Sequence, residues 1–307
     1  MKILILGSSG QIGSELQSSI IDFSQSYLPN SNDLNISDLN KKDMNFLDFE
    51  KLQKTLEDFS PHVVINAAAF TDVDFAEDQE EEAFKMNSEF PGRLGELCSK
   101  MGSILIHFST DYVFNGKLSR PYQEEDNVDP IGVYGRSKLE GEEKIRNSCK
   151  KYIILRTAWV FGKKGKNFVK TMIKLGNIHD EVSVVADQIG SPTSAVSISN
   201  AVAKIIFEMQ NASSNDRRWG TYHFSGLPYV SWADFASEIF EQAFKKGVIE
   251  DITNVIRISS NDFETKAKRP NNSRLNCKKI ELNFGIDSDD WKKSLDILLN
   301  LLVKKNG

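Results

Sequence analysis

A glycine-rich turn between an apolar segment and an amphipathic one is the feature that most constrains the fold of this 307-residue chain. Residues 2–6 are mainly apolar, and Gly7, Gly10 and Gly13 follow them with G-x-x-G-x-x-G spacing. The first glycine permits a tight turn, the second lets the backbone approach a diphosphate, and the third lets a helix pack closely on the strand. The helix N-terminus adds amide donors and a positive dipole end. The sequence therefore predicts a dinucleotide-binding turn.

The first half of the chain alternates short apolar runs with longer helical patterns. Strands are predicted at residues 2–6, 63–69, 104–109 and 152–156, with a polar strand within 35–40, and helices at residues 11–23, 49–57, 80–101 and 137–149. Such alternation is typical of βαβ units, and right-handed crossovers arrange these units in a doubly wound parallel sheet. We expect an α/β fold with a Rossmann-type sheet.

The second half has a less regular pattern. Helices are predicted at residues 168–175, 196–210 and 289–303, and strands at residues 181–185 and 219–224. Ser231 and Asp234 have the spacing of a helix capping box. Because no Pro-rich or Gly/Ser-rich linker occurs, we predict two docked domains. The dinucleotide-binding domain covers residues 1–157, and a smaller α/β substrate-binding domain covers mainly residues 158–307, with some segments returning to the first sheet.

Composition argues against several classes of partner. The formal net charge is −5, from 38 Lys and Arg against 43 Asp and Glu, which offers no general attraction to nucleic acid. No apolar run reaches membrane-spanning length, and the early glycine at position 7 leaves no room for a secretory signal. The three cysteines are far apart, as is usual in a reducing compartment, and the four histidines lack metal-ligand spacing. We therefore expect a cytoplasmic protein without a membrane segment or a protein-bound metal.

Tyr134 and Lys138 suggest the chemistry, because residues four apart share one face of a helix. A free phenol has a pKa of about 10, and a nearby ammonium favours the phenolate. Tyr134 is therefore a candidate general acid or base, with Lys138 expected to lower its pKa and to hold a ribose. Thr110 ends a predicted strand at the edge where open α/β sheets bind ligands. In a carbonyl reduction, Thr110 would hydrogen-bond the carbonyl oxygen, Tyr134 would protonate it, and a nicotinamide would supply hydride.

The choice between NADH and NADPH depends on residues after the second strand. An acidic side chain there favours the free ribose hydroxyl of NAD, and a basic one accommodates the phosphate of NADP. Asp38, Asn40, Lys41 and Lys42 all lie near the predicted strand end. Both cofactors are therefore expected to fit, with NADPH slightly favoured if Lys41 or Lys42 points inward. Whether Mg²⁺ takes part is not decided by the sequence.

Several motifs occur in order along the chain. They are Asn66-Ala-Ala-Ala-Phe-Thr-Asp-Val-Asp74, Ser109-Thr-Asp-Tyr-Val-Phe114, Arg156-Thr-Ala-Trp-Val-Phe-Gly162 and Asp187-Gln-Ile-Gly-Ser-Pro-Thr193. With them the sequence resembles the dTDP-4-dehydrorhamnose reductases, a branch of the extended short-chain dehydrogenase/reductases. The resemblance implies NAD(P)H-dependent reduction of the 4-keto group of a nucleotide-linked deoxysugar, most simply dTDP-4-dehydro-L-rhamnose, in polysaccharide biosynthesis. It also implies a homodimer.

The same resemblance implies the residues that form the site. Cofactor contacts are expected at Gly7, Gly10, Gln11, Ile12, Gly13, Asn45, Phe46, Ala69, Phe70, Thr71, Phe108, Tyr134 and Lys138. Substrate contacts are expected at Thr110, Asp111 and Trp159. The chain departs from the family pattern at Phe70, where a histidine is common, and in a longer segment over residues 20–35. The longer segment bears on cofactor preference, because it precedes the ribose-reading position.

Two other functions are consistent with parts of this pattern. Related sugar-nucleotide dehydratases carry Thr-Asp-Glu where this chain has Thr110-Asp111-Tyr112, so the missing glutamate argues against dehydration. An epimerase is the related alternative within the same fold. A cofactor-binding regulatory subunit, resembling the non-catalytic partner of methionine adenosyltransferase, can keep the same residues. Intact Thr110, Tyr134 and Lys138 fit an enzyme more simply.

Overall fold

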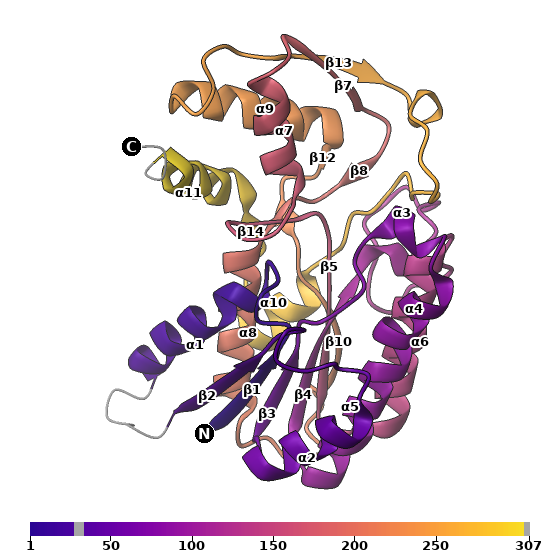
Figure 1. The fold of residues 1–307 in the computed structure, drawn as a ribbon, viewed down its shortest axis with the longest axis vertical. Coiled ribbons are helices and arrows are strands. Elements are labelled where there is room, and N and C mark those ends of the chain that lie inside the picture. The colour runs from indigo at the N-terminus through magenta and orange to yellow at the C-terminus, as the bar shows by residue number, and fades with distance from the viewer. Residues whose placement is uncertain (28–33, 304–307) are drawn as a thin grey trace.

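The computed structural model describes residues 1–27 and 34–303 and contains a central sheet of six parallel strands. Its order is β10-β5-β4-β3-β1-β2 (Figure 1). The strands are β1 (Lys2–Leu6), β2 (Asn35–Leu39), β3 (Val63–Asn66), β4 (Ile104–Thr110), β5 (Tyr152–Thr157) and β10 (Gly220–His223). The order reverses between β1 and β3, and such a switch point opens a crevice beyond the carboxyl ends of the strands. The predicted doubly wound α/β fold is confirmed.

Helices cover both faces of this sheet, as Figure 1 shows. One face carries α1 (Gly13–Tyr27), α8 (Ala195–Met209) and α10 (Lys278–Phe284), and the other carries α2 (Phe49–Phe59), α5 (Phe90–Met101) and α6 (Val133–Ser148). Strand side chains alternate between the faces, so Ile3 and Ile5 join one core while Leu4 and Leu6 join the other. Burial on both faces explains why β1 is apolar from Ile3 to Leu6.

A second lobe lies beyond the carboxyl ends of the sheet strands (Figure 1). It contains α7 (Phe168–Gly176), α9 (Trp232–Lys245), α11 (Trp291–Val303), β7 (Glu181–Val185) and β13 (Asn254–Ile258), which surround a separate apolar core. The predicted capping box is present at α9, where Ser231 Oγ accepts from the Asp234 amide at 3.1 Å. The second half of the chain contributes to both lobes, because β10 pairs with β5 and α8 packs on α1.

Short elements complete the fold. They are α3 (Val73–Ala76), α4 (Glu80–Phe84), η1 (Lys85–Glu89), η2 (Asp111–Val113), β6 (Val160–Phe161), β8 (Ile189–Gly190), β9 (Thr193–Ser194), β11 (Gly226–Leu227), β12 (Val230–Ser231), η3 (Ser260–Asp262) and β14 (Asp289–Asp290). Within residues 1–27 and 34–303, no helix is both long and apolar enough to cross a membrane.

Three element boundaries differ from the sequence prediction in ways that matter for the site. The helix predicted over residues 80–101 is α4 followed by the π-turn η1 and α5, and η1 buries the side chain of Asn87. The Asn87 amide bonds the backbone of Phe70 in both directions, at 2.9 Å each. The helix predicted from residue 137 begins at Val133, which places Tyr134 in its first turn. The strand predicted to residue 69 ends at Asn66.

Candidate functional site

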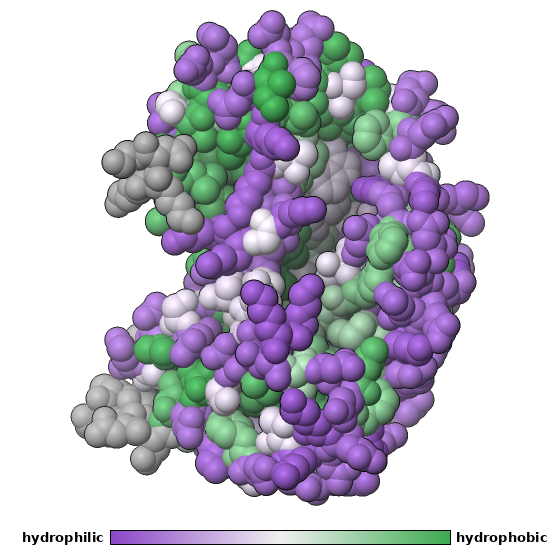
Figure 2. Space-filling view, in the orientation of Figure 1, coloured by the Kyte–Doolittle hydropathy of each residue, from purple (hydrophilic) through white to green (hydrophobic). Residues whose placement is uncertain are grey.

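A cavity of about 510 Å³ lies where the carboxyl ends of the sheet strands meet the second lobe. Figure 2 shows the surface hollowed between the two lobes. The predicted site residues that line this cavity are Gly7, Gly10, Gln11, Ile12, Phe46, Ala69, Thr71, Phe108, Thr110, Asp111, Tyr134, Lys138 and Trp159. The fold thus brings most of the predicted residues to one place, although they span more than 150 positions of sequence.

Three predicted residues lie outside the cavity lining. Gly13 supports the turn from beneath, because a Cβ there would lie 2.2 Å from the Gly7 carbonyl oxygen. The side chain of Asn45 accepts a hydrogen bond from the Leu47 amide. The ring of Phe70 stacks on Phe75, with ring centroids 6.0 Å apart. Their predicted cofactor contacts therefore stay predictions.

The glycine-rich turn has the geometry that a dinucleotide requires. Gly7 adopts a left-handed φ of +88°, and a Cβ on it would lie 2.5 Å from the Ala68 amide nitrogen. The amides of Gly7 and Ser8 both donate to the Leu39 carbonyl, at 2.7 and 3.2 Å, and so fix the turn beside the end of β2. A backbone cradle at the start of a long helix fits a bound diphosphate, because helix N-termini present amide donors and a positive dipole.

The end of β2 places one basic side chain at the cavity. Lys41 lines it, whereas Lys42 and Asp38 do not. The Asp43 carboxylate accepts a hydrogen bond from the Asn40 amide at 2.8 Å and is committed to that turn. Among the charged residues near the end of β2, Lys41 is therefore the one that reaches the cavity.

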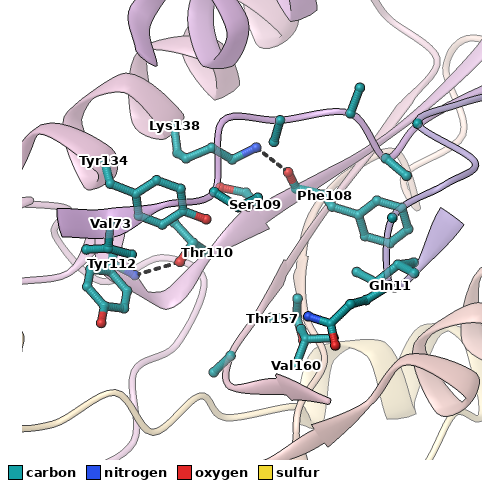
Figure 3. A pocket seen from close by; sticks show the side chains of 18 of the residues that line it. Gln11, Val73, Phe108, Ser109, Thr110, Tyr112, Tyr134, Lys138, Thr157 and Val160 are labelled. Atoms are coloured by element: carbon teal, nitrogen blue, oxygen red, sulfur yellow. Dashed lines mark hydrogen bonds between the residues drawn. The ribbon is translucent and has the colours of Figure 1, made fainter. Parts of the chain in front are cut away.

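The side chains of Thr110 and Tyr134 lie close together in the lining of the cavity (Figure 3). Thr110 ends β4, donates to Asp111 Oδ1 at 2.9 Å and accepts from the Tyr112 amide at 3.2 Å. Burial, together with the Asp111 carboxylate, raises the pKa of Tyr134 to about 12, and the neighbouring Thr110 hydroxyl offsets only part of this rise. Tyr134 therefore keeps its proton at neutral pH.

Lys138 has different neighbours from those that the sequence suggested. Its Nζ donates to the Phe108 carbonyl at 2.6 Å, as Figure 3 shows, and lies 3.2 Å from His107 Nε2. Burial lowers the pKa of Lys138 to about 8, and the Glu142 carboxylate offsets part of this. The prediction that Lys138 lowers the pKa of Tyr134 is wrong for this structure, because burial dominates the phenol and the ammonium group points to β4.

Asp111 is a buried carboxyl group beside the hydroxyls of Thr110 and Tyr134. Burial raises its pKa from 3.8 to about 6, and the hydroxyls of Ser273 and Thr110 lower it only in part. Within the described residues, its Oδ2 has no hydrogen-bond partner of standard geometry. A buried carboxylate with too few hydrogen-bond donors lowers the stability of the folded protein, and such a group is usually retained for function.

The second lobe supplies an aromatic wall. Trp159 stacks on Trp232 with ring centroids 3.5 Å apart and an interplanar angle of 11°. Trp159 adopts a left-handed φ of +47°, and a Cβ on Gly190 would lie 2.4 Å from its indole. These contacts fix the indole at the cavity, where it can meet the apolar face of a sugar.

Arg269 and Trp232 line the cavity but were not among the predicted site residues. The Arg269 guanidinium bonds Asp74 Oδ2 at 2.6 Å, and its buried Nε has no partner within the described residues. The sequence alone did not place either Arg269 or Trp232 in the cavity. In residues 1–27 and 34–303, no group of three or more His, Cys, Asp or Glu side chains could hold a metal ion.

Comparison with known proteins identifies relatives along nearly the whole chain. A family model described as the RmlD substrate binding domain matches residues 1–303. A dTDP-4-dehydrorhamnose reductase of Aggregatibacter actinomycetemcomitans is 40% identical over 96% of this chain and 97% of its own length. The protein of the same name from Escherichia coli K12 is 34% identical, with 98% of each chain covered.

Solved structures agree with this assignment. A dTDP-4-dehydrorhamnose reductase from Clostridium acetobutylicum has a TM-score of 0.87 and 37% identity, covering 98% of this chain and 99% of its own. One from Bacillus anthracis, in complex with NADP, has a TM-score of 0.85 and 34% identity, covering 97% and 98%. The findings support the predicted reductase family rather than the regulatory-subunit alternative. With the family model spanning residues 1–303 and relatives more than 30% identical over nearly their full length, the chain belongs to the dTDP-4-dehydrorhamnose reductase family.

Proposed function

We propose that this protein reduces the 4-keto group of dTDP-4-dehydro-L-rhamnose to give dTDP-L-rhamnose, with NADPH or NADH as reductant. The observation that carries this proposal is that Thr110, Tyr134 and the glycine-rich turn line one cavity. Family membership adds the identity of the sugar nucleotide. The reaction class itself follows from two hydroxyls placed beside a nucleotide-binding turn.

The chain's own residues deliver the proton. Tyr134 is a protonated phenol across the neutral range because burial raises its pKa to about 12, so it can act as a general acid. Thr110 would turn its hydroxyl from Asp111 to the ketone oxygen and hold that oxygen beside Tyr134. When the ketone oxygen takes the proton, a phenolate remains, and the ammonium form of Lys138, one helical turn along α6, would turn from the Phe108 carbonyl to stabilise it.

The cofactor would lie along the turn and the sheet edge, where a bound nicotinamide supplies the hydride. Gly7 and Gly10 leave room for its diphosphate, while Ala69, Phe46 and Phe108 line the adjacent cavity wall. Lys41 would meet the 2′-phosphate of NADPH, and this supports NADPH as the preferred reductant. NADH would bind with the same contacts except that one.

The sugar nucleotide would occupy the side of the cavity formed with the second lobe. The Trp159 indole offers a flat apolar face and an N–H donor, which suit a deoxysugar. Asp111 would accept a hydrogen bond from a sugar hydroxyl. Arg269 would bind the diphosphate, because a guanidinium forms paired hydrogen bonds with phosphate oxygens. These contacts support residues 1–157 as the main dinucleotide-binding domain and residues 158–307 as mainly the substrate-binding domain.

The location and assembly of the protein are part of the same proposal. Three free, buried cysteines, Cys98, Cys149 and Cys277, suit a reducing compartment, and we place the reaction in the cytoplasm. We infer a homodimer from family resemblance, which sedimentation of the purified chain would test.

A coupled assay tests the proposed reaction. The keto sugar is generated in place, and NADPH absorbance is followed after addition of the protein. We expect NADPH to be consumed in a one-to-one ratio with dTDP-L-rhamnose formed, and to be spared when the sugar is omitted. Oxidation no faster than this background, with either reduced cofactor, would contradict the proposal.

A further inference from the structure

A buried chain of hydrogen bonds connects the backbone at the end of β3 to Lys138. The Ala68 amide donates to Asn66 Oδ1 at 3.1 Å, and Asn66 Nδ2 lies 3.0 Å from His107 Nδ1. His107 Nε2 lies 3.2 Å from Lys138 Nζ, which also donates to the Phe108 carbonyl. The side chains of Asn66, His107 and Lys138 are each at most 2% exposed. The three polar groups therefore satisfy one another without bulk water.

The Ala68 amide determines the direction of each hydrogen bond between Ala68, Asn66 and His107. It can only donate, so the Asn66 atom that faces it must be the carbonyl oxygen, and the Asn66 nitrogen must face His107. An amide NH₂ has no acceptor, so His107 Nδ1 must accept and carry no hydrogen. A neutral imidazole then carries its hydrogen on Nε2, and an imidazolium is excluded because Nδ1–H would meet a second donor. Burial lowers the pKa of His107 well below its usual value, in agreement with the neutral ring.

The Nε2–H group of His107 points at Lys138 Nζ. An ammonium has three donors and no acceptor, so it would place a hydrogen against a hydrogen at this 3.2 Å contact. A neutral amine has a lone pair that accepts from Nε2–H and still donates to the Phe108 carbonyl. The hydrogen-bond geometry is therefore complete only with the amine form.

We propose that Asn66 and His107 are positioning residues that set the protonation state of Lys138, with Asn66 fixing the Nε2–H tautomer of His107 and that tautomer favouring the neutral amine. The effect of this role on turnover rests on the proposed function, whereas its effect on the protonation of His107 and Lys138 does not. The ammonium form stabilises the phenolate left by Tyr134, so the pair determines the pH above which Lys138 loses that charge.

Other charged groups near Lys138 do not replace this control. On α6, Glu142 raises the pKa of Lys138, but its carboxylate is held by Arg156 of β5 at 2.7 and 2.9 Å. Tyr134, also on α6, is neutral at the same pH, and Asp111 of η2 acts on Tyr134. From β4, His107 is the titratable group in contact with Nζ.

The first test is the tautomer of His107 in the unmodified full chain. Long-range ¹H–¹⁵N NMR with labelled histidine distinguishes Nε2–H from Nδ1–H and from imidazolium. We expect the Nε2–H form across pH 6 to 8. An Nδ1–H ring or an imidazolium in that range would overturn the proposal. This measurement needs neither substrate nor activity, so it is independent of whether the protein is a reductase.

The second test is N66D, which is nearly isosteric. Its carboxylate still accepts from the Ala68 amide, but it also accepts at His107 Nδ1, so the hydrogen moves there and Nε2 becomes an acceptor for the Lys138 ammonium. We expect the tautomer signal to switch and the midpoint of the Lys138 ¹³Cε titration to rise by about one pH unit or more. The falling limb of kcat/KM, where loss of the Lys138 ammonium is expected to lower activity, should move upward with it.

A double-variant comparison separates the tautomer from the added charge. In the H107F background, N66D adds the same carboxylate without an imidazole that can switch. N66D should raise the proton-binding constant of Lys138 in both backgrounds. We expect the factor of increase to be at least three times smaller in H107F than in the unmodified background. Equal shifts in both backgrounds would overturn the proposal, because charge alone would then explain the effect. NADPH binding and circular dichroism confirm that each variant is folded.

Discussion

Replacement of Asp111 by asparagine should make the protein more stable at alkaline pH while impairing the reaction. Asp111 is 3% exposed, and burial raises its pKa to about 6 from 3.8. Asparagine has nearly the same shape, keeps an acceptor for the Thr110 hydroxyl that now donates to Oδ1, and has no charge to bury. The substitution therefore removes a cost without opening a cavity.

The size of this gain follows from the pKa difference. A shift of about 2 units at about 1.4 kcal/mol each corresponds to roughly 3 kcal/mol when the group is fully ionised. Because the folded state binds the proton more tightly, the native carboxyl group adds no penalty well below pH 3.8. The penalty grows as pH rises from about 4 to about 6 and is constant above that range. The D111N gain in unfolding free energy should follow the same curve, and it should be roughly 1.5 kcal/mol larger at pH 8 than at pH 5.

Urea denaturation of both proteins at pH 5 and pH 8 measures this difference. Asp22→Asn is the matched control, because Asp22 is an exposed carboxylate on α1. The control removes an exposed carboxylate and should not reproduce the D111N gain. A D111N protein that is less stable than the unmodified one at pH 8, or whose gain is the same at both pH values, would refute the reasoning. The kcat/KM for the sugar nucleotide should fall in D111N, as expected for a site that sacrifices stability for function.

Three further substitutions test other parts of the account. Tyr134→Phe removes the proton donor, so turnover should fall about 10²- to 10⁴-fold while NADPH binding, followed by fluorescence, is retained; unchanged turnover would reject its role. Lys41→Glu should lower the ratio of kcat/KM for NADPH to kcat/KM for NADH by about tenfold or more, which corresponds to roughly 1.4 kcal/mol. An unchanged ratio would reject the contact between Lys41 and the 2′-phosphate. Arg156→Met removes the buried partner of the Glu142 carboxylate and leaves it only the partly exposed Arg146, so urea unfolding should show a loss of about 3–5 kcal/mol, whereas a loss below about 1 kcal/mol would contradict the importance of the buried pair.

Much of the fold could be predicted from the sequence, because strands, turns and helices are specified largely by residues that are close together along the chain. The apolar run of β1 and the glycines after it specify a strand, a turn and a helix within residues 2–27, and the structure has all three. The polar β2 was also predicted, although its strand signal is weaker. The π-turn η1 was not predicted, because it depends on Asn87 reaching the backbone of Phe70 across the fold.

The site was predictable in its parts but not in its electrostatics. Sequence spacing placed Tyr134 and Lys138 on one face of a helix, and the structure confirms that helix. It could not show that Lys138 turns to His107, because that contact depends on how α6 packs over β4. Arg269 and Trp232 reach the cavity through tertiary packing of the second lobe, which no short pattern encodes.

The most direct test of the central claim is to follow the hydride itself. The protein is given NADPH carrying deuterium at the transferable position of the nicotinamide C4, together with dTDP-4-dehydro-L-rhamnose, and the product is analysed by NMR and mass spectrometry. We predict dTDP-L-rhamnose with one deuterium, bound to C4 of the sugar, and almost none of this product with the Tyr134→Phe variant. Deuterium at another carbon, or a product without it, would contradict the proposed reduction.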